Sequence, residues 1–232
     1  MIKTTKMHQK EPTPKVVKKG MIKMAAYIIV AVVAYLLGSI SFSVIISKKM
    51  AGFDVREKGS GNAGATNMLR SVGKKAAALT LLCDALKGVL AILVAVLVGA
   101  IAKNSDKALL VQIAGILVVV GHTFPVFFEF KGGKGVATSL GVLLTTNWKI
   151  GLICLVFALV LMALTKMVSM GSVGAAILFP VLVLFMNTNF TVSEGSSYLI
   201  YSIILAAIVA FNHRSNIKRI LNGTENKLSF KK

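Results

Sequence analysis

The strongest constraint on the fold is a series of apolar runs, several of them long enough to cross a lipid bilayer. A transmembrane helix needs about 20 mostly apolar residues. The first run, Met24 to Ser47, exceeds this length, and no small-residue cleavage signal precedes Lys48, so we predict a retained helix rather than a signal peptide. The other predicted spans are 76–102, 108–128, 135–147, 150–165, 171–187 and 197–212. The sequence therefore predicts an all-α polytopic integral membrane protein with about seven transmembrane helices.

The composition excludes an ordinary soluble protein. Hydrophobic residues make up 56% of the 232 residues and charged residues 15%, whereas a typical soluble domain is about 25% charged. The net charge of +19 alone would suggest a nucleic-acid binder, but such a protein needs far more polar surface than this chain has. We expect no nucleic-acid partner and expect the basic residues to lie in loops and tails beside membrane lipids.

The basic residues also predict the domain organisation and the topology. Residues 1–23 are predicted to form a disordered basic tail, 24–212 a membrane domain, and 213–232 a basic C-terminal segment. If the N-terminus is outside, most Lys and Arg residues fall in cytoplasmic segments, as the positive-inside rule requires. We therefore predict an outside N-terminus and a cytoplasmic C-terminus, although the basic tail argues for the opposite orientation.

The first polar segment, Gly59 to Arg70, is rich in groups that bind anions. Its glycines are Gly59, Gly61 and Gly64, and its neutral polar residues include Ser60, Asn62, Thr66 and Asn67. Glycines let backbone N–H groups approach a ligand closely, as in a backbone anion nest. Arg70 adds a forked cation suited to phosphate. We interpret the segment as a phosphate-binding loop; the alternative is a flexible polar loop.

The second polar segment combines a histidine with a glycine–lysine run. His122 lies near the end of a predicted span, where an ionisable group is costly unless it is paired or functional. The run that follows consists of Lys131, Gly132, Gly133, Lys134 and Gly135. It places two cations just ahead of a predicted helix, which favours anion binding. It is not a P-loop, because Gly135 stands where that motif has Ser or Thr.

The third polar segment follows the last predicted span and extends from Asn212 to Lys227. Basic residues such as Arg214 suit a helix C-terminus and the lipid headgroups. That explanation does not account for His213 and Asn216, which share one face if the helix continues.

Two charged residues, Asp84 and Lys87, lie inside the second predicted span. Their spacing of three residues lets them neutralise each other on one helix face, so we predict a structural ion pair rather than direct ligand contact. No cluster of Asp, Glu, His or Cys has metal-ligand spacing, so we predict no metal and no cofactor.

The three polar segments resemble the motifs of the bacterial acyl-phosphate:glycerol-3-phosphate acyltransferases, the PlsY family, and the segment 84–88 resembles that family's second span. The resemblance covers about residues 24–228. It implies a seven-helix enzyme of the bacterial cell membrane whose active site faces the cytoplasm. Such an enzyme transfers an acyl group from acyl-phosphate to the 1-hydroxyl of glycerol 3-phosphate. The products are lysophosphatidic acid and phosphate, in the first acylation step of phospholipid synthesis.

The resemblance also implies roles for individual residues. The catalytic residues would be Ser60, Arg70, His122, Lys134, His213 and Asn216. The substrate-binding residues would be Gly59, Gly61, Asn62, Gly64, Thr66, Asn67, Lys131, Gly132, Gly133, Gly135, Arg214 and Glu225. The expected partners are the two substrates, membrane lipids and the enzyme that supplies acyl-phosphate.

Two other function classes share part of this sequence pattern. A transporter or binder of a phosphorylated small molecule could use the same loops, but a transporter should carry charges in several spans, and only Asp84 and Lys87 are clearly intramembrane. Acyltransferases with a His-x-x-x-x-Asp pair are excluded, since Phe127 and Lys218 stand at the fifth position after the two candidate histidines. Because no acid has a local spacing to either histidine, we predict that the substrate phosphate accepts the proton; a distant partner remains an alternative.

Overall fold

The computed structural model describes residues 13–103, 105–186 and 196–228, and every regular element in these ranges is helical. The elements are α1 (Pro14–Gly38), α2 (Phe42–Ala51), η1 (Val55–Glu57), α3 (Ala65–Ser71), α4 (Lys74–Ile101), α5 (Lys107–Thr123), η2 (Val126–Phe128), α6 (Val136–Thr146), α7 (Trp148–Thr165), α8 (Val168–Phe185), α9 (Ser196–Asn212) and α10 (Arg214–Leu221). The predicted all-α class is confirmed.

The helices account for all seven predicted apolar segments. Within the described residues, five helical segments are long and apolar enough to cross a membrane, and they correspond to α1 with α2, α4, α5, α7 and α8. Helices α9 and α10 form a further apolar pair that is bent by 65°, and α6 is a shorter apolar helix. Their lengths and compositions fit a multi-pass membrane protein, while the number of crossings stays a prediction.

Helix α1 begins earlier than the sequence analysis predicts. It starts at Pro14, so the prediction that 14–23 belong to a disordered tail is wrong. Proline is favoured in the first turn of a helix because it lacks an N–H that would be unpaired there, and lysine is a good helix former. Residues 1–12 of the predicted tail lie outside the described residues.

The first predicted span is interrupted rather than continuous. Helix α1 ends at Gly38 and α2 begins at Phe42. The ammonium group of Lys87 donates hydrogen bonds to the carbonyl oxygens of Gly38 at 2.9 Å and Ile40 at 2.8 Å. A buried cation from another helix thus satisfies carbonyl groups at the interruption, which a local sequence pattern does not reveal.

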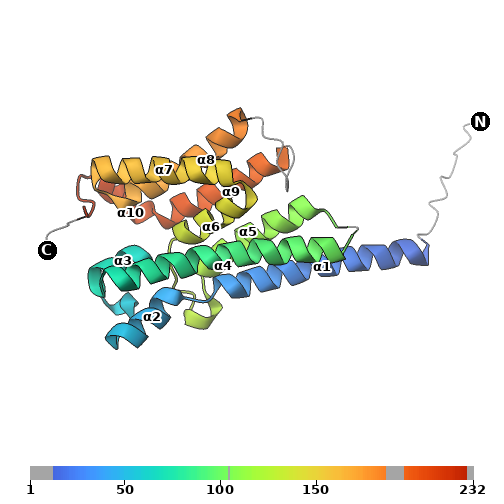
Figure 1. Cartoon of the computed structure of the whole chain (residues 1–232), viewed down its shortest axis with the longest axis horizontal. Helices are drawn as coiled ribbons and strands as arrows, with labels where there is room; N and C mark the ends of the chain where they lie inside the picture. The colour runs from blue at the N-terminus through green and yellow to red at the C-terminus, as the bar shows by residue number, and fades with distance from the viewer. Residues whose placement is uncertain (1–12, 104, 187–195, 229–232) are drawn as a thin grey trace, which may run out of the picture.

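The helices form two layers joined by α6. In Figure 1, α1, α4 and α5 form the lower layer and α7, α8 and α9 the upper one, and α6 contacts both α4 and α7. A buried apolar core that includes Val30, Val118 and Leu205 connects the two layers.

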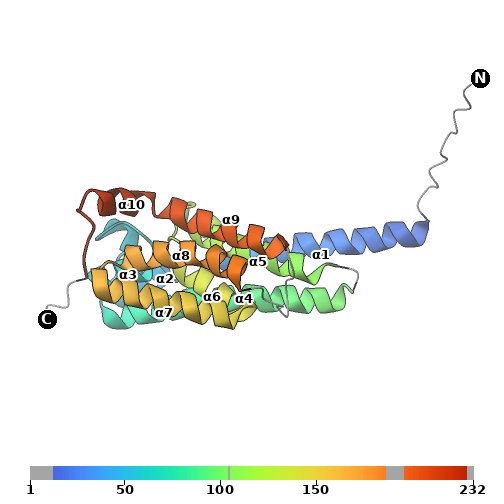
Figure 2. The same ribbon diagram turned by 90° about the horizontal axis from the view of Figure 1, so that it is seen from above.

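The short helices gather at one end of the bundle. Helices α2, α3 and α10 lie at the end opposite the start of α1, whose first turns extend past the other helices in both views (Figure 1, Figure 2). The start of α1 and the helix α10 therefore lie at opposite ends, as an outside N-terminus and a cytoplasmic C-terminus would require. The orientation of the bundle in the membrane stays a prediction.

Candidate active site

All three polar segments line one cavity of about 470 Å³. Its polar part includes side chains from the loop before α3, from the loop before α6 and from α10. Its apolar part continues between the two layers, where it is lined by residues of α6, α7, α8 and α9 such as Leu143, Leu155, Phe179 and Leu205. One cavity thus joins a cationic end to a hydrophobic interior.

The buried amide of Asn67 organises the first polar segment. Its Nδ2 donates to the carbonyl oxygens of Val55 at 2.9 Å and Lys58 at 3.0 Å, and its Oδ1 accepts from the N–H of Ser60 at 2.9 Å. Gly59 has φ of 59°, and a Cβ there would lie 2.2 Å from Asn67 Oδ1, so the turn requires glycine. Asn67 therefore holds the shape of the loop.

Some backbone groups of this loop are already hydrogen-bonded within the protein, whereas two of its side chains are free to bind a ligand. The N–H groups of Ser60, Gly61 and Gly64 are used in bonds to Asn67 Oδ1, Lys58 O and Asn62 O respectively, so these three do not form the predicted anion nest. The exposed side chains of Ser60 and Arg70 line the cavity and form no hydrogen bond or ion pair with the described residues. Asn62, Gly64 and Thr66 also line the cavity.

The second polar segment packs directly against His122. The N–H of Gly132 donates to Thr123 O and that of Gly133 to His122 O, both at 3.1 Å. A Cβ on Gly133 would lie 2.2 Å from His122 Nε2, so only glycine permits this approach. The two glycines thereby lead the chain to Lys134, whose side chain reaches the cavity.

A hydrogen-bonded chain connects Lys134 to the third polar segment. Lys134 Nζ donates to Asn216 Oδ1, and Asn216 Nδ2 donates to Glu225 Oε1 at 2.7 Å. Glu225 also accepts from Ser169 Oγ at 2.7 Å and from Arg219 Nε at 2.8 Å. The buried Glu225 carboxylate therefore fixes Asn216, which in turn orients Lys134.

The environment of Lys134 weakens its hold on its proton. Burial lowers the pKa of Lys134 to about 8; the positive charges of Arg219 and Arg70 act in the same direction, and Glu225 opposes them. An anion that enters the cavity would replace lost solvation and stabilise the charged form. Lys134 is therefore suited to bind phosphate.

His213 marks the bend between α9 and α10. Its Nδ1 lies 2.8 Å from the carbonyl oxygen of Val209, which can only accept, so Nδ1 carries the proton and donates. In the neutral ring, Nε2 is then the acceptor. His213 and Asn216 both line the cavity even though the helix bends by 65°.

Asp84 and Lys87 form an ion pair, and a third residue joins it. Lys87 Nζ lies 3.0 Å from Asp84 Oδ1, and His122 Nδ1 lies 3.5 Å from the same oxygen. All three side chains are buried, and Asp84 and His122 line the cavity. His122 thus has the distant acidic partner that local spacing could not reveal.

A second cavity of about 250 Å³ adjoins the first. Its lining includes Gly132, Gly133 and Arg214, and it shares Asn62 and Lys134 with the first cavity. The guanidinium of Arg214 stacks on the Phe211 ring at 4.5 Å. Two adjoining spaces with a shared cation offer room for more than one anionic group.

The structure brings most of the predicted site residues together. Gly59, Gly61 and Lys131 line neither cavity, and the exposed Lys131 side chain pairs with Glu129 at 3.2 Å. Ser169 and Arg219 hold Glu225, and their site role could not be predicted from the sequence because both residue types are common in ordinary helix ends and loops. In the part of the chain that the structure describes, no three His, Cys, Asp or Glu side chains are placed to hold a metal ion.

Comparisons with known proteins agree on one family. The sequence model of the family described as glycerol-3-phosphate acyltransferase matches residues 28–223. A glycerol-3-phosphate acyltransferase of Clostridioides difficile is 48% identical over 210 residues, covering 89% of this chain and 98% of that protein. One from Thermoanaerobacter is 45% identical over 204 residues, covering 88% and 96%.

A solved structure has the same architecture. The crystal structure of PlsY, an integral membrane glycerol 3-phosphate acyltransferase, in its glycerol 3-phosphate form superimposes with a TM-score of 0.76 at 37% identity, covering 88% of this chain and 96% of that one. The lysophosphatidic acid form gives a TM-score of 0.74 at 36% identity, covering 88% and 95%. With the sequence matches, these findings show that the chain belongs to the glycerol-3-phosphate acyltransferase family of integral membrane proteins.

Proposed function

We propose that this protein transfers an acyl group from acyl-phosphate to the 1-hydroxyl of glycerol 3-phosphate and releases lysophosphatidic acid and inorganic phosphate. The observation that carries the proposal is a cavity in which a cationic end meets an apolar interior. An acyl donor with a phosphate head needs both environments. The crystal structures of PlsY are a glycerol 3-phosphate form and a lysophosphatidic acid form, and these two compounds are the acceptor and a product of this reaction.

The two parts of the cavity suggest where each group binds. The acyl chain would lie between the layers, against apolar side chains of α7, α8 and α9. Its phosphate would reach Ser60, Arg70 and Lys134, whose donors line the polar end. Lys134 borders both cavities, so it can contact the phosphates of both substrates.

The chemistry requires stabilisation of charge on the departing phosphate. The hydroxyl oxygen of glycerol 3-phosphate attacks the acyl carbonyl carbon, an ester bond forms, and the bond between that carbon and the phosphate oxygen breaks. The phosphate leaves with the electron pair. Arg70 and Lys134 would neutralise the departing phosphate, and Ser60 would donate a hydrogen bond to it.

The proton of the attacking hydroxyl has two candidate acceptors. The phosphate of the donor carries basic oxygens and can take the proton, with the histidines orienting the substrates. His122 is the second candidate, because a base oriented by a carboxylate is a common arrangement and Asp84 lies 3.5 Å from its Nδ1. Asp84 is also paired with Lys87, which neutralises its charge and weakens its effect on His122. We therefore favour the substrate phosphate.

The cellular setting is part of the proposal. We place the protein in the bacterial plasma membrane with the polar end of the cavity facing the cytoplasm, where glycerol 3-phosphate is dissolved. Membrane lipids would surround the apolar helix faces. The enzyme that supplies acyl-phosphate would deliver it to the same side.

A donor comparison tests the proposal. Purified protein in detergent is incubated with glycerol 3-phosphate and, in separate reactions, palmitoyl phosphate, palmitoyl-CoA or palmitoyl-carrier protein. We expect lysophosphatidic acid only with palmitoyl phosphate. Turnover with a thioester alone would refute acyl-phosphate as the donor. No turnover with any donor would contradict the proposed reaction and favour the transporter alternative, which flux measurements in liposomes would then test.

A further inference from the structure

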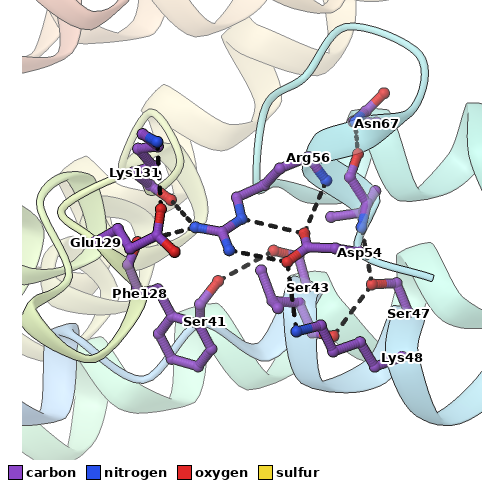
Figure 3. A network of polar contacts seen from close by, with 12 residues as sticks. Ser41, Ser43, Ser47, Lys48, Asp54, Arg56, Asn67, Phe128, Glu129 and Lys131 are labelled. Carbon is purple, nitrogen blue, oxygen red and sulfur yellow. Dashed lines mark hydrogen bonds and ion pairs between the residues drawn. The ribbon is translucent and has the colours of Figure 1, made fainter. Parts of the chain in front are cut away.

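Arg56 lies outside both cavities. It joins two segments that lead directly to cavity-lining residues, one to Ser60 and the other to Lys134 (Figure 3). Its Nε and Nη2 donate to the two carboxylate oxygens of Asp54 at 3.1 and 2.8 Å. Its Nη1 donates to the carbonyl oxygens of Phe128 at 2.8 Å and Lys131 at 3.4 Å. One guanidinium group therefore connects η1, next to the first polar loop, with the turn that precedes Lys134.

The first end of this connection is fixed to the first polar loop. The N–H of Val55 donates to Ser47 Oγ at 3.1 Å, and its carbonyl oxygen accepts from Asn67 Nδ2 at 2.9 Å. Asn67 also holds Ser60 through its backbone N–H. A displacement of η1 would therefore be transmitted to Ser60.

The second end of the connection is a turn with an unusual backbone. Glu129 and Phe130 have φ values of 56° and 57°, a conformation that is unfavourable for residues other than glycine. Such a conformation persists when surrounding contacts hold it. The carbonyl groups on either side of these two residues, those of Phe128 and Lys131, are the ones that Arg56 binds. The chain then continues through Gly132 and Gly133 to Lys134.

We propose that Arg56 is a positioning residue that sets the location of Lys134 relative to Ser60 and Arg70. The inference rests on the proposed function, in which these three residues hold the phosphate groups. The chemistry suits arginine, because a planar fork can bind one carboxylate through two donors while a third nitrogen binds carbonyl groups. A lysine offers a point charge and cannot keep this geometry.

The local charges support a fixed connection. The Arg56 side chain is 18% exposed and Asp54 7%, so water competes weakly for their hydrogen bonds. The hydrogen bonds from Arg56 hold the pKa of Asp54 below its ordinary value, so the carboxylate stays charged at neutral pH. Lys48 also approaches Asp54, at 3.6 Å, but its side chain is 60% exposed and forms no hydrogen bond with the turn 128–131.

A double-mutant cycle on ligand binding tests the inference. The dissociation constant of glycerol 3-phosphate is measured by calorimetry for wild type, Arg56→Lys, Lys134→Met and the double variant. We expect Arg56→Lys to weaken binding about tenfold in the wild-type background and to have little further effect once Lys134 is absent, since residues that act through one another are not additive. Equal effects in both backgrounds would overturn the inference.

The control removes the other cation near the Asp54 carboxylate and leaves the contacts of the turn 128–131 unchanged. Lys48→Met should bind glycerol 3-phosphate as wild type does, and a loss equal to that of Arg56→Lys would overturn the inference. Hydrogen–deuterium exchange of 126–134 gives an independent measurement: Arg56→Lys should raise exchange there and leave α4 unchanged. If Arg56→Lys does not fold, Asp54→Asn replaces it in the same cycle, because it removes the carboxylate that orients Arg56.

Different results would contradict the role of Arg56 and the proposed function. Wild-type protein that binds glycerol 3-phosphate but turns over no palmitoyl phosphate would contradict the proposed reaction. Wild-type turnover combined with additive effects in the cycle would contradict only the role of Arg56.

Discussion

His122 Nδ1 lies 3.5 Å from the carboxylate of Asp84, a residue of a different helix, and both side chains line the main cavity. Lys87 reaches the same carboxylate oxygen at 3.0 Å. The carboxylate can therefore orient the imidazole while its charge is balanced by the ammonium group. Either His122 or the phosphate of the donor could therefore accept the proton of the attacking hydroxyl, and kinetic measurements can distinguish the two.

The first prediction separates a histidine base from a substrate base. If the histidines only orient substrate, His122→Gln and His213→Asn should each reduce kcat less than Lys134→Met, which should cost about a hundredfold, or on the order of 3 kcal/mol. The measurement is kcat as a function of pH for the three variants. A histidine variant that keeps only the background rate and loses an ionisation near neutral pH would identify that histidine as the base.

The second prediction concerns the charge of Lys134. Because the pKa of Lys134 is lowered to about 8, the free enzyme loses this cation as pH rises through 8, and kcat/KM for glycerol 3-phosphate should fall about tenfold per pH unit above it. Bound phosphate favours the charged form, so the fall in kcat should begin at higher pH. In Lys134→Arg the fall should disappear from this range. The same alkaline fall in that variant would assign it to another group.

The third prediction concerns the length of the acyl chain. Among the cavity-lining residues of α8, Phe179 lies farthest from Ser169, about 15 Å along the helix axis. Its ring packs edge-on against the rings of Tyr198 and Tyr201, with centroid distances of 6.0 and 6.4 Å. Phe179→Leu should therefore favour longer acyl phosphates, with the ratio of rates for 20- and 16-carbon donors rising roughly tenfold. Ile177→Ala, at a position 58% exposed on the same helix, is the control. An unchanged chain-length profile would show that the acyl tail does not end at Phe179.

The fourth prediction concerns the carboxylate that orders the third polar segment. Burial raises the pKa of Glu225, but the hydrogen bonds from Asn216, Ser169 and Arg219 outweigh it and hold the pKa below its ordinary 4.5. Its stabilising contribution is therefore present above pH 4.5 and is lost as pH falls through the lowered value. Glu225→Gln should reduce stability by about 1–2 kcal/mol at pH 7, since one charged acceptor is replaced.

Thermal unfolding in detergent measures this effect. A decrease of several degrees is expected for Glu225→Gln at pH 7, shrinking toward acidic pH. The exposed Glu57→Gln should leave the transition unchanged. A similar decrease in both variants would mean that the network around Glu225 contributes no more than an ordinary surface charge.

The fifth prediction concerns topology. Single cysteines at Lys131 and Asn222 should react only with reagents that reach the cytoplasmic face, and one at Lys103 only from outside, in a background in which Cys83 and Cys154 are replaced by alanine. These positions are exposed, whereas a side chain at Gly133 would collide with His122. Labelling of all three positions from one side would refute the arrangement.

Local patterns in the amino-acid sequence are sufficient to predict the class of protein and the position of most helices. Hydropathy and proline or glycine signals are local, so the runs around α4, α5 and α7 could be read directly from the chain. The three polar segments could likewise be recognised because each is contiguous. The pairing of Asp84 with Lys87 followed from helical spacing.

Which of these groups contact one another depends on the packing of the helices. The contact of His122 with Asp84, the bonds of Lys87 to the interruption after α1, and the connection made by Arg56 all join different elements. Their geometry depends on how whole helices pack, and a local pattern carries no information about that packing. The start of α1 at Pro14 has a different explanation. A lysine-rich segment is compatible with either a disordered tail or a helix. Its continuity with the apolar helix that follows selects the helix.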